Sequence, residues 1–186
     1  MTKSHSERTE CAVVTIGHST RTLETFIHLL QTYEVKQVVD VRTVPRSRHN
    51  PQFNHETLPD DLKAAGIGYL HMPGLGGLRR PRPDSTNTGW HNASFRGFAD
   101  YMETPEFENH LGKLIKVAQQ KRIALMCAEA LPWRCHRSLI ADALEVREIR
   151  VAHILSSTHL QPHRITPFAR VDGIRLVYPP EKTLTQ

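Results

Sequence analysis

Residues 12–41, which read AVVTIGHSTRTLETFIHLLQTYEVKQVVDV, decide the fold of this chain. The run Ala12–Ile16 is almost entirely apolar, which is typical of a strand buried on both faces of a sheet. Apolar residues then recur at helical spacing from Leu23 to Tyr33, and Val38–Val41 forms a second short apolar run. This order predicts two parallel strands joined by a helix that crosses over the sheet.

The same alternation continues along the rest of the chain. Further strands are expected over 67–70, 123–127 and 151–154, and helices over 56–65, 95–102, 138–147 and the segment after Thr104. Thr104 and Pro105 form a typical helix start, because threonine caps well and proline fits the first helical position. We therefore expect an α/β fold: a three-layer, Rossmann-like sandwich with a mostly parallel sheet of about five strands. Residues 168–178 predict a C-terminal β-hairpin that turns at Asp172-Gly173.

Length and composition indicate a single domain over residues 1–186. Hydrophobic residues make up 39% and charged residues 23% of the chain, which is typical of a globular protein. Residues 1–11 hold no apolar run, so we expect a disordered tail and not a secretory signal. Residues 71–94 are rich in proline and glycine and are expected to form a long functional loop, and 165–178 a hairpin extension.

Charge and cysteine content narrow the class of partner. No apolar run approaches the roughly 18 residues of a spanning helix, so no membrane partner is expected. The three cysteines are an odd, low number that indicates reduced thiols and a cytoplasmic location. The formal net charge of +5 favours an anionic partner, either a small molecule or a nucleic acid. The oligomeric state does not follow from the sequence.

Polar and reactive side chains gather where the predicted strands end. Ligands of open parallel sheets bind beyond the carboxyl ends of the strands, so these residues are expected to line one site. They are Gly17-His18-Ser19, Asp40-Val-Arg42 with Arg46, His71, Gly76-Gly77, Cys127-Ala-Glu129 and Cys135-His136-Arg137.

Part of this set is suited to binding an anion. Asp40 and Arg42 lie on the same side of a strand, so the carboxylate can orient the guanidinium towards a phosphate or carboxylate. Arg46 and Arg137 add positive charge, and the turn at Ser19 leads towards a helix N-terminus, where backbone N–H groups attract anions. Gly76 and Gly77 allow close approach of the backbone to a ligand. The alternatives are a structural ion pair, a helix cap at Ser19 or Thr20, and ordinary turns.

Another part is suited to catalysis. Cys135 lies beside Arg134, His136 and Arg137, whose positive charge lowers a thiol pKa and favours a nucleophilic thiolate. Glu129 and Asp40 are candidates for acid–base chemistry, and His18 or His136 for proton transfer. The alternative for Cys135 is a buried, inert cysteine.

Metal and nucleotide cofactors receive little support. A metal is not favoured, and Cys127 and His71 are the candidate ligands if one binds. The chain has no G-x-G-x-x-G after its first strand and no G-x-x-x-x-G-K-[ST], so neither a dinucleotide fingerprint nor a P-loop is indicated. The cofactor is unknown.

An ordered set of motifs resembles the bacterial and archaeal family catalogued as domain of unknown function 488. The resemblance covers residues 13–178 and implies a compact cytoplasmic α/β domain, with no reaction attached. The motifs are Thr15-Ile-Gly-His-Ser-Thr-Arg21, Asp40-Val-Arg42, Pro45-Arg-Ser-Arg48, Pro51-Gln-Phe-Asn54, His71-Met-Pro-Gly-Leu-Gly-Gly77, Asn92-Ala-Ser-Phe-Arg-Gly-Phe98, Cys127-Ala-Glu129, Pro132-Trp-Arg134, Cys135-His-Arg-Ser138 and Thr166-Pro-Phe-Ala-Arg170.

Three classes of function remain open at this point. The first is an enzyme, a hydrolase or transferase, that acts on a phosphate-bearing substrate such as a nucleotide or nucleic acid, N-glycosidic cleavage included. The second is a non-catalytic nucleic-acid binder that stacks bases on Trp90, Phe95 and Trp133. The third is a thiol- or metal-dependent sensor built on Cys127 and Cys135.

Overall fold

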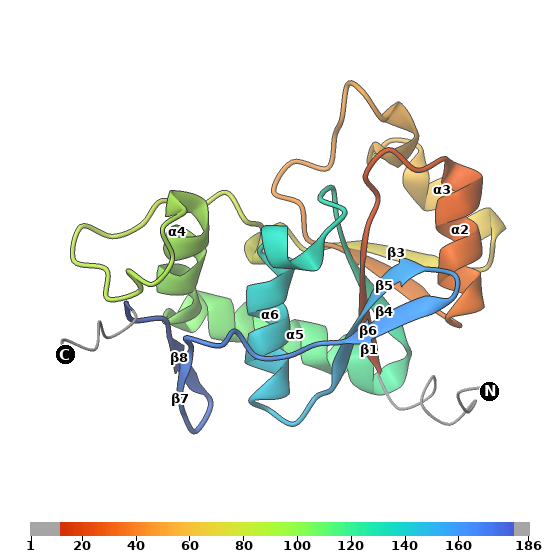
Figure 1. Cartoon of the computed structure of the whole chain (residues 1–186). Helices are drawn as coiled ribbons and strands as arrows, with labels where there is room; N and C mark the ends of the chain where they lie inside the picture. The colour runs from red at the N-terminus through yellow and green to blue at the C-terminus, as the bar shows by residue number, and fades with distance from the viewer. Residues whose placement is uncertain (1–11, 181–186) are drawn as a thin grey trace.

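The centre of the molecule is a six-stranded sheet, seen in a computed structural model that describes residues 12–180 (Figure 1). Its order is β3-β2-β4-β1-β5-β6. The first five strands are parallel, and β6 runs antiparallel to β5. The strands are β1 (Val13–Gly17), β2 (Gln37–Asp40), β3 (Gly68–His71), β4 (Ile123–Cys127), β5 (Val151–Ser156) and β6 (His159–Pro162). The predicted parallel sheet is confirmed. The edge strand β6 was not predicted, because His159-Leu-Gln-Pro162 has no apolar run.

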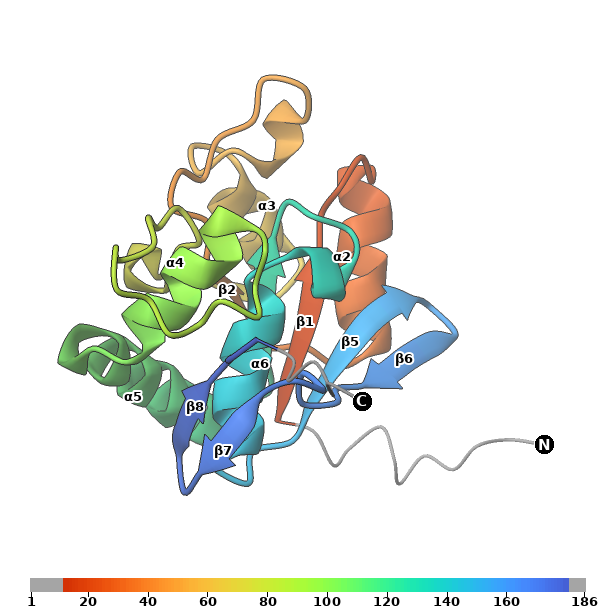
Figure 2. The ribbon, with the colours of Figure 1, turned by 60° about the vertical axis from the view of Figure 1, so that its left-hand side comes forward.

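Helices cover both faces of the sheet and complete the predicted three-layer sandwich (Figures 1 and 2). The two connections from β1 to β3 run in one direction along the sheet, and those from β3 to β5 run in the other. Crossovers of one hand then place their helices on opposite faces. One face carries α2 (Leu23–Thr32) and α3 (Leu58–Ala64), and the other carries α4 (Ala93–Met102), α5 (Pro105–Gln120) and α6 (Arg137–Glu145).

Alternate residues of each strand feed two separate cores. Val14 of β1 and Met126 of β4 pack with α2 and α3, whereas Val13 and Leu125 pack with α5 and α6. Because side chains alternate along a strand, Cys127 falls on the same side as Leu125 and packs towards α6. The alternation therefore fixes which face of the sheet the cysteine meets. Within the described residues, no helix is both long and apolar enough to cross a membrane.

The N-caps of two helices can be compared with those expected from the sequence. Thr104 caps α5 as predicted, and its hydroxyl accepts a hydrogen bond from the Phe107 N–H. Helix α2 differs, because its cap is Thr22 and not Ser19 or Thr20. The Ser19 backbone turns with a φ of 48°, and its N–H donates to the Ala128 carbonyl, so the helix starts only after this turn.

The expected functional loop 71–94 is largely anchored to the rest of the molecule. The loop is shorter than expected, because His71 still belongs to β3 and Ala93 already begins α4; between them the regular structure is a single 3₁₀ turn at Pro73–Leu75. Buried Asn87 donates to the Asp100 carboxylate on α4 and accepts from the Tyr178 N–H. The ring of Trp90 packs on those of Phe95 and Phe168. The expected tail 1–11 lies outside the described residues.

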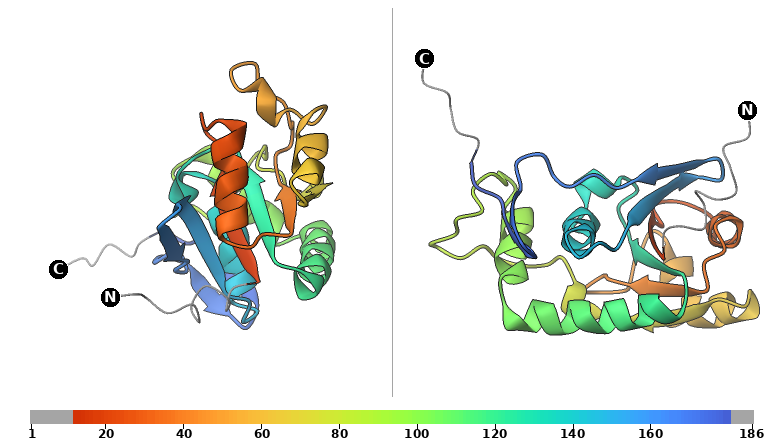
Figure 3. Two further views of the ribbon diagram at one scale, coloured as in Figure 1. Left: turned by 90° about the vertical axis from the view of Figure 1, so that its right-hand side faces the viewer. Right: turned by 90° about the horizontal axis from the view of Figure 1, so that it is seen from below.

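The predicted C-terminal hairpin is confirmed. It consists of β7 (Arg170–Asp172) and β8 (Arg175–Val177) and lies beside α4 and α6 (Figure 3). Buried Asp142 of α6 anchors the segments on either side of the hairpin by hydrogen bonds. Its carboxylate accepts hydrogen bonds from the His163 ring, from the Thr166 hydroxyl and N–H, and from the Tyr178 hydroxyl, at 2.7–3.0 Å. One carboxylate thus joins the hairpin segment to the sandwich.

We predict that Asp142→Ala lowers the free energy of unfolding by about 3–5 kcal/mol, because it leaves several buried donors without an acceptor. Urea unfolding followed by circular dichroism measures the loss. Asp172→Ala on the exposed hairpin is the control and should change stability by less than about 0.5 kcal/mol. Equal effects of the two substitutions would show that Asp142 is not an anchor.

Candidate functional site

A cavity of about 660 Å³ lies beyond the carboxyl ends of β1, β2 and β4. The chain leaves β1 and β2 towards α2 and α3 but leaves β4 towards α6, so the connections diverge here and open a crevice. The sheet topology therefore creates the pocket. Its walls include His18, Ser19, Arg42, Arg46, Gly77, Phe95, Cys127, Glu129, Arg134, Cys135 and His136.

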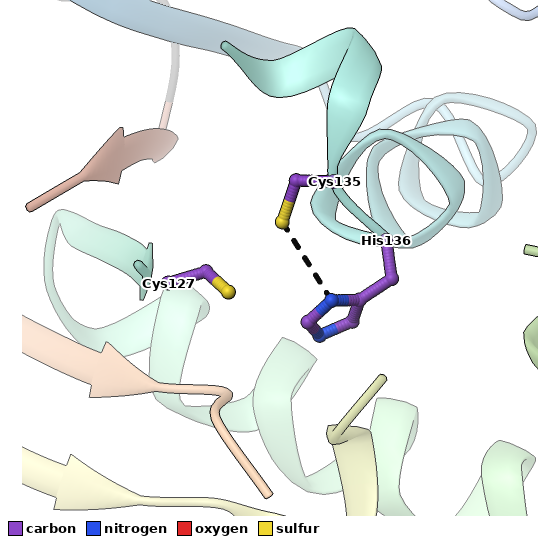
Figure 4. Close-up of side chains that lie close together, drawn as sticks. All are labelled: Cys127, Cys135 and His136. Carbon is purple, nitrogen blue, oxygen red and sulfur yellow. Dashed lines mark hydrogen bonds between the residues drawn. The ribbon is translucent and has the colours of Figure 1, made fainter. Parts of the chain in front are cut away.

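Two cysteines and a histidine that line this cavity lie close together (Figure 4). Cys127 ends β4, and Cys135 and His136 immediately precede α6. The two sulfur atoms and a ring nitrogen of His136 all lie within 4.8 Å of one another, and Cys135 Sγ is 3.6 Å from His136 Nδ1. His136 Nε2–H donates to the Val41 carbonyl, which only accepts, and this bond turns Nδ1 towards the sulfur.

Arg137 supplies an uncompensated positive charge behind the cluster. Its side chain is 1% exposed, and its guanidinium donates through Nε to Cys135 Sγ at 3.3 Å and through NH2 to the Glu129 carbonyl. Among residues 12–180 it forms no ion pair with a carboxylate. Because buried arginine is normally paired with an anion, the sulfur of Cys135 is the group placed to balance it.

The pKa values of the two thiols are shifted in opposite directions. The pKa of Cys135 falls well below 9, because it accepts a hydrogen bond from the Cys127 thiol and lies beside His136 and Arg137, which together outweigh its burial. The pKa of Cys127 rises for the converse reason, since its proton is held by the Cys135 sulfur and burial disfavours its charged form. Cys135 is therefore the more acidic of the two thiols and Cys127 the less acidic.

A second group of side chains forms a rigid floor. Asp40 is fully buried and holds Arg42 through two bonds, at 2.9 Å to Nε and 2.6 Å to NH2, while the Tyr69 hydroxyl donates to the same carboxylate. Arg42 also donates to the Phe53 carbonyl and to His18 Nε2. Asp40 itself does not line the cavity. Its position is that of a residue that orients Arg42, and the predicted acid–base role has no geometric support.

His18 belongs to this floor. Its Nδ1–H donates to the Ser19 carbonyl, so Nε2 carries the lone pair that accepts from Arg42. Burial lowers the pKa of His18 to about 4, and the ring stacks on Phe53 at 4.4 Å. Both ring nitrogens therefore have partners within the protein, and the proton transfer by His18 stays a prediction.

The predicted anion-binding turn is also otherwise engaged. The His18 and Ser19 N–H groups donate to the Cys127 and Ala128 carbonyls at 2.9 Å. These donors hold the strand ends together and do not face a ligand. Gly17 allows this approach, because a Cβ there would come within 1.9 Å of the Glu129 carbonyl oxygen. Ser19 nevertheless lines the cavity.

Arg46 and Arg134 also line the cavity, and they lie outside the floor. Arg134 is exposed and forms no ion pair within the part of the chain described, whereas Arg46 pairs with exposed Glu56. Arg42 lines the cavity, but its hydrogen bonds leave a single N–H free on NH1. Glu129 lines the same wall, and its carboxylate accepts from the Leu131 N–H.

The two glycines of the loop differ. Gly77 lines the cavity, and a Cβ there would lie 2.5 Å from His136 Nδ1, so glycine keeps the space beside that nitrogen open. Gly76 does not line the cavity; a Cβ on it would meet the Thr43 hydroxyl at 2.3 Å, so it serves packing.

Cys127, Cys135 and His136 have the donor atoms that a thiophilic metal prefers. The Arg137 guanidinium against Cys135 opposes the addition of a further cation. The other predicted ligand, His71, lies behind the floor, where its Nε2–H donates to the Arg42 carbonyl.

Some site residues escaped the sequence reasoning. Phe53 and Tyr69 complete the floor, although only the position of Phe53 within the motif at 51–54 gave any signal. Of the three aromatic residues predicted to stack nucleic-acid bases, Trp133 is 54% exposed. Trp90 and Phe95 pack on one another, with their ring centroids 4.7 Å apart.

Comparison with known proteins gives one match. Residues 22–144 match the model of the family described as "Domain of unknown function DUF488". No curated protein and no solved structure matches the chain. The matched range spans the floor residues other than His18, the glycines of the loop, both cluster cysteines and most of α6.

We predict that the alkylation rate of Cys135 by iodoacetamide follows a titration with a midpoint well below pH 9, since the thiolate is the reacting form. Cys127→Ala removes a hydrogen bond to that thiolate and should move the midpoint upwards. Peptide mass mapping identifies the alkylated cysteine. A midpoint at the ordinary thiol pKa in the wild type would contradict the assignment.

We predict that buried His18 makes the fold sensitive to acid. Its folded pKa of about 4 lies below the usual 6.5, so its contribution is complete above pH 6.5 and is lost as the pH falls towards 4. His18→Asn should reduce the loss of unfolding free energy between pH 7 and 4.5 by about 1–3 kcal/mol, measured by urea unfolding. His28→Asn, on the exposed face of α2, is the control and should leave the pH dependence unchanged.

Proposed function

The chain belongs to the DUF488 family, whose description names no activity, and we propose from its site that it is a hydrolase or transferase with Cys135 as nucleophile and an anionic, phosphate-bearing substrate. The observation that carries the proposal is the buried guanidinium of Arg137 against Cys135 Sγ at the wall of the cavity. A buried cation with a sulfur as its available counter-ion favours the thiolate, which is the nucleophilic form of cysteine.

His136 is placed to handle the proton of the reaction. Its Nδ1 lies 3.6 Å from Cys135 Sγ, and its Nε2–H bond to Val41 holds the ring in that orientation. A nucleophile beside a base that a third group orients is the usual arrangement for covalent catalysis. We assign the orientation of water in a second step to Glu129, the carboxylate that lines the same wall.

The chemistry takes two steps. In the first, the thiol proton of Cys135 passes to His136 Nδ1, the Cys135 sulfur attacks an electrophilic atom of the substrate, a bond to sulfur forms, and the bond to the leaving group breaks. The leaving group keeps the electron pair and takes the proton of His136 Nδ1. In the second, water or an acceptor hydroxyl attacks the same atom, the bond to sulfur breaks, and its proton returns to His136.

The charge distribution supports an anionic substrate. Arg42, Arg46 and Arg134 line the cavity against the single carboxylate of Glu129 among the lining residues described. The charge of Arg137 lies close enough to lower the pKa of His18 and Arg21 further, after burial. Positive potential in a concave site raises the local concentration of anions. A cavity of about 660 Å³ is within the size range of small-molecule sites.

We predict that a phosphorylated ligand raises the midpoint of thermal unfolding of the wild type. At a hundred times its dissociation constant it adds about 2.7 kcal/mol, which shifts the midpoint by about 5–10 °C. The screen contains inorganic phosphate, sugar phosphates, nucleotides and short oligonucleotides. Arg134→Ala should lose most of the shift, and Arg170→Ala, exposed on the hairpin, should keep it.

The ligand so found is then offered as substrate. Cys135→Ser should bind it and turn it over at least about a thousandfold more slowly, and the wild type should show a mass adduct on Cys135. Full turnover by Cys135→Ser would refute the nucleophile. An equal shift in Arg134→Ala and wild type would refute the anion site.

A further inference from the structure

The two sulfur atoms of the site face one another without being joined. Cys127 and Cys135 are both free thiols, and their Sγ atoms lie within 4.8 Å of each other across the loop 128–134 (Figure 4). Both line the cavity, so a small oxidant in solution reaches them through its mouth. The pair therefore has the proximity and the access that thiol oxidation needs.

The surroundings give the two thiols different tasks. Cys135 is the one contacted by the Arg137 guanidinium and the His136 ring, which stabilise its anionic form. Cys127 lies near the same groups, but the Arg137 guanidinium donates to the Cys135 sulfur, and the pKa of Cys127 is raised because its proton is held by that sulfur. A thiolate that reacts first and a neighbouring thiol that reacts second is the arrangement of redox-sensitive cysteine pairs.

We propose that Cys135 is an oxidative modification site for hydroperoxides and that Cys127 is its resolving cysteine, so that peroxide closes the pair into a disulfide. The proposal rests on the proposed function, because it uses the same thiolate and assigns a regulation to that site. In the oxidised form the nucleophile is consumed, and the enzyme is inactive until a dithiol reduces it.

The reaction balances in two steps. The Cys135 thiolate attacks one oxygen of the hydroperoxide, the O–O bond breaks, and sulfenic acid forms while the departing oxygen leaves as water or alcohol with a proton from solvent. The Cys127 thiol, losing its proton to solvent, then attacks the Cys135 sulfur; the S–S bond forms, and hydroxide leaves to become water. The peroxide gains two electrons, and the two thiols lose them.

Local backbone structure favours closure. Neither cysteine lies inside a helix, since Cys127 ends β4 and Cys135 precedes α6. The loop between them holds only a 3₁₀ turn at Pro132–Arg134. Rotation about both Cα–Cβ bonds, with a small shift of this loop, therefore brings the sulfurs together without unwinding a helix.

The test uses the full chain, hydrogen peroxide and intact mass. We expect the wild type to lose about 2 Da and two of its thiols, with Cys127 and Cys135 joined in a tryptic peptide pair, and dithiothreitol to restore both. Cys127→Ser should instead gain one oxygen on Cys135, trapped by dimedone. Cys135→Ser should lose the rapid reaction altogether. Cys11→Ser, a substitution outside the cluster, should form the same disulfide as the wild type.

Several outcomes would overturn the proposal. They are a wild type that forms no intramolecular disulfide, the same product in wild type and Cys127→Ser, or a bound stoichiometric metal that protects both thiols. Cys127→Ala serves as a second variant if the serine form fails to fold. The readout needs no substrate, so a protein that forms the disulfide yet turns over no phosphorylated compound would refute the proposed function alone.

Discussion

The contact between the Arg137 guanidinium and the Cys135 sulfur is the constraint on which the rest of the site depends. A guanidinium that is 1% exposed is costly to bury without an anion, and no carboxylate among residues 12–180 pairs with it. The Glu129 carbonyl is a second acceptor for the guanidinium. The N-terminus of α6 and His136 lie beside the sulfur. The loop after β4 is shaped to bring these groups together.

That loop reaches its place because of the sheet topology. Strand β4 lies between β1 and β2, but its chain leaves towards the opposite face. The ends of three strands consequently diverge, and the chain at 127–137 must fold back over β1. Gly17 permits the closest approach, and the His18 and Ser19 N–H groups fix it by hydrogen bonds. The sequence analysis assigned these two backbone N–H groups to an anion, but in the structure they bond the end of β1 to the end of β4.

The sequence was sufficient for the fold class and for the sheet edge beyond which the cavity lies. Apolar runs of strand length, helical spacing in 23–33 and the cap at Thr104 are local signals, and each was confirmed. It was insufficient for the roles of individual residues. His18, Asp40 and Arg42 stand at strand ends just as Cys127 does, yet they bond to one another and to Phe53 in a closed network. Which polar groups face the cavity and which face each other depends on contacts between residues distant in sequence, such as Tyr69 with Asp40.

This division gives the site two layers with opposite properties. The floor is saturated: the carboxylate of Asp40, four of the five N–H groups of Arg42 and both nitrogens of His18 have partners. The cluster above it is polarised instead: its buried guanidinium has a sulfur and no carboxylate against it among residues 12–180, and its two thiols differ in acidity. A saturated network is rigid and chemically quiet, whereas perturbed pKa values are typical of functional sites. The rigid layer keeps Arg42 and the strand ends in place, so the cluster next to it, which includes Cys127 at the end of β4, is held in a fixed geometry.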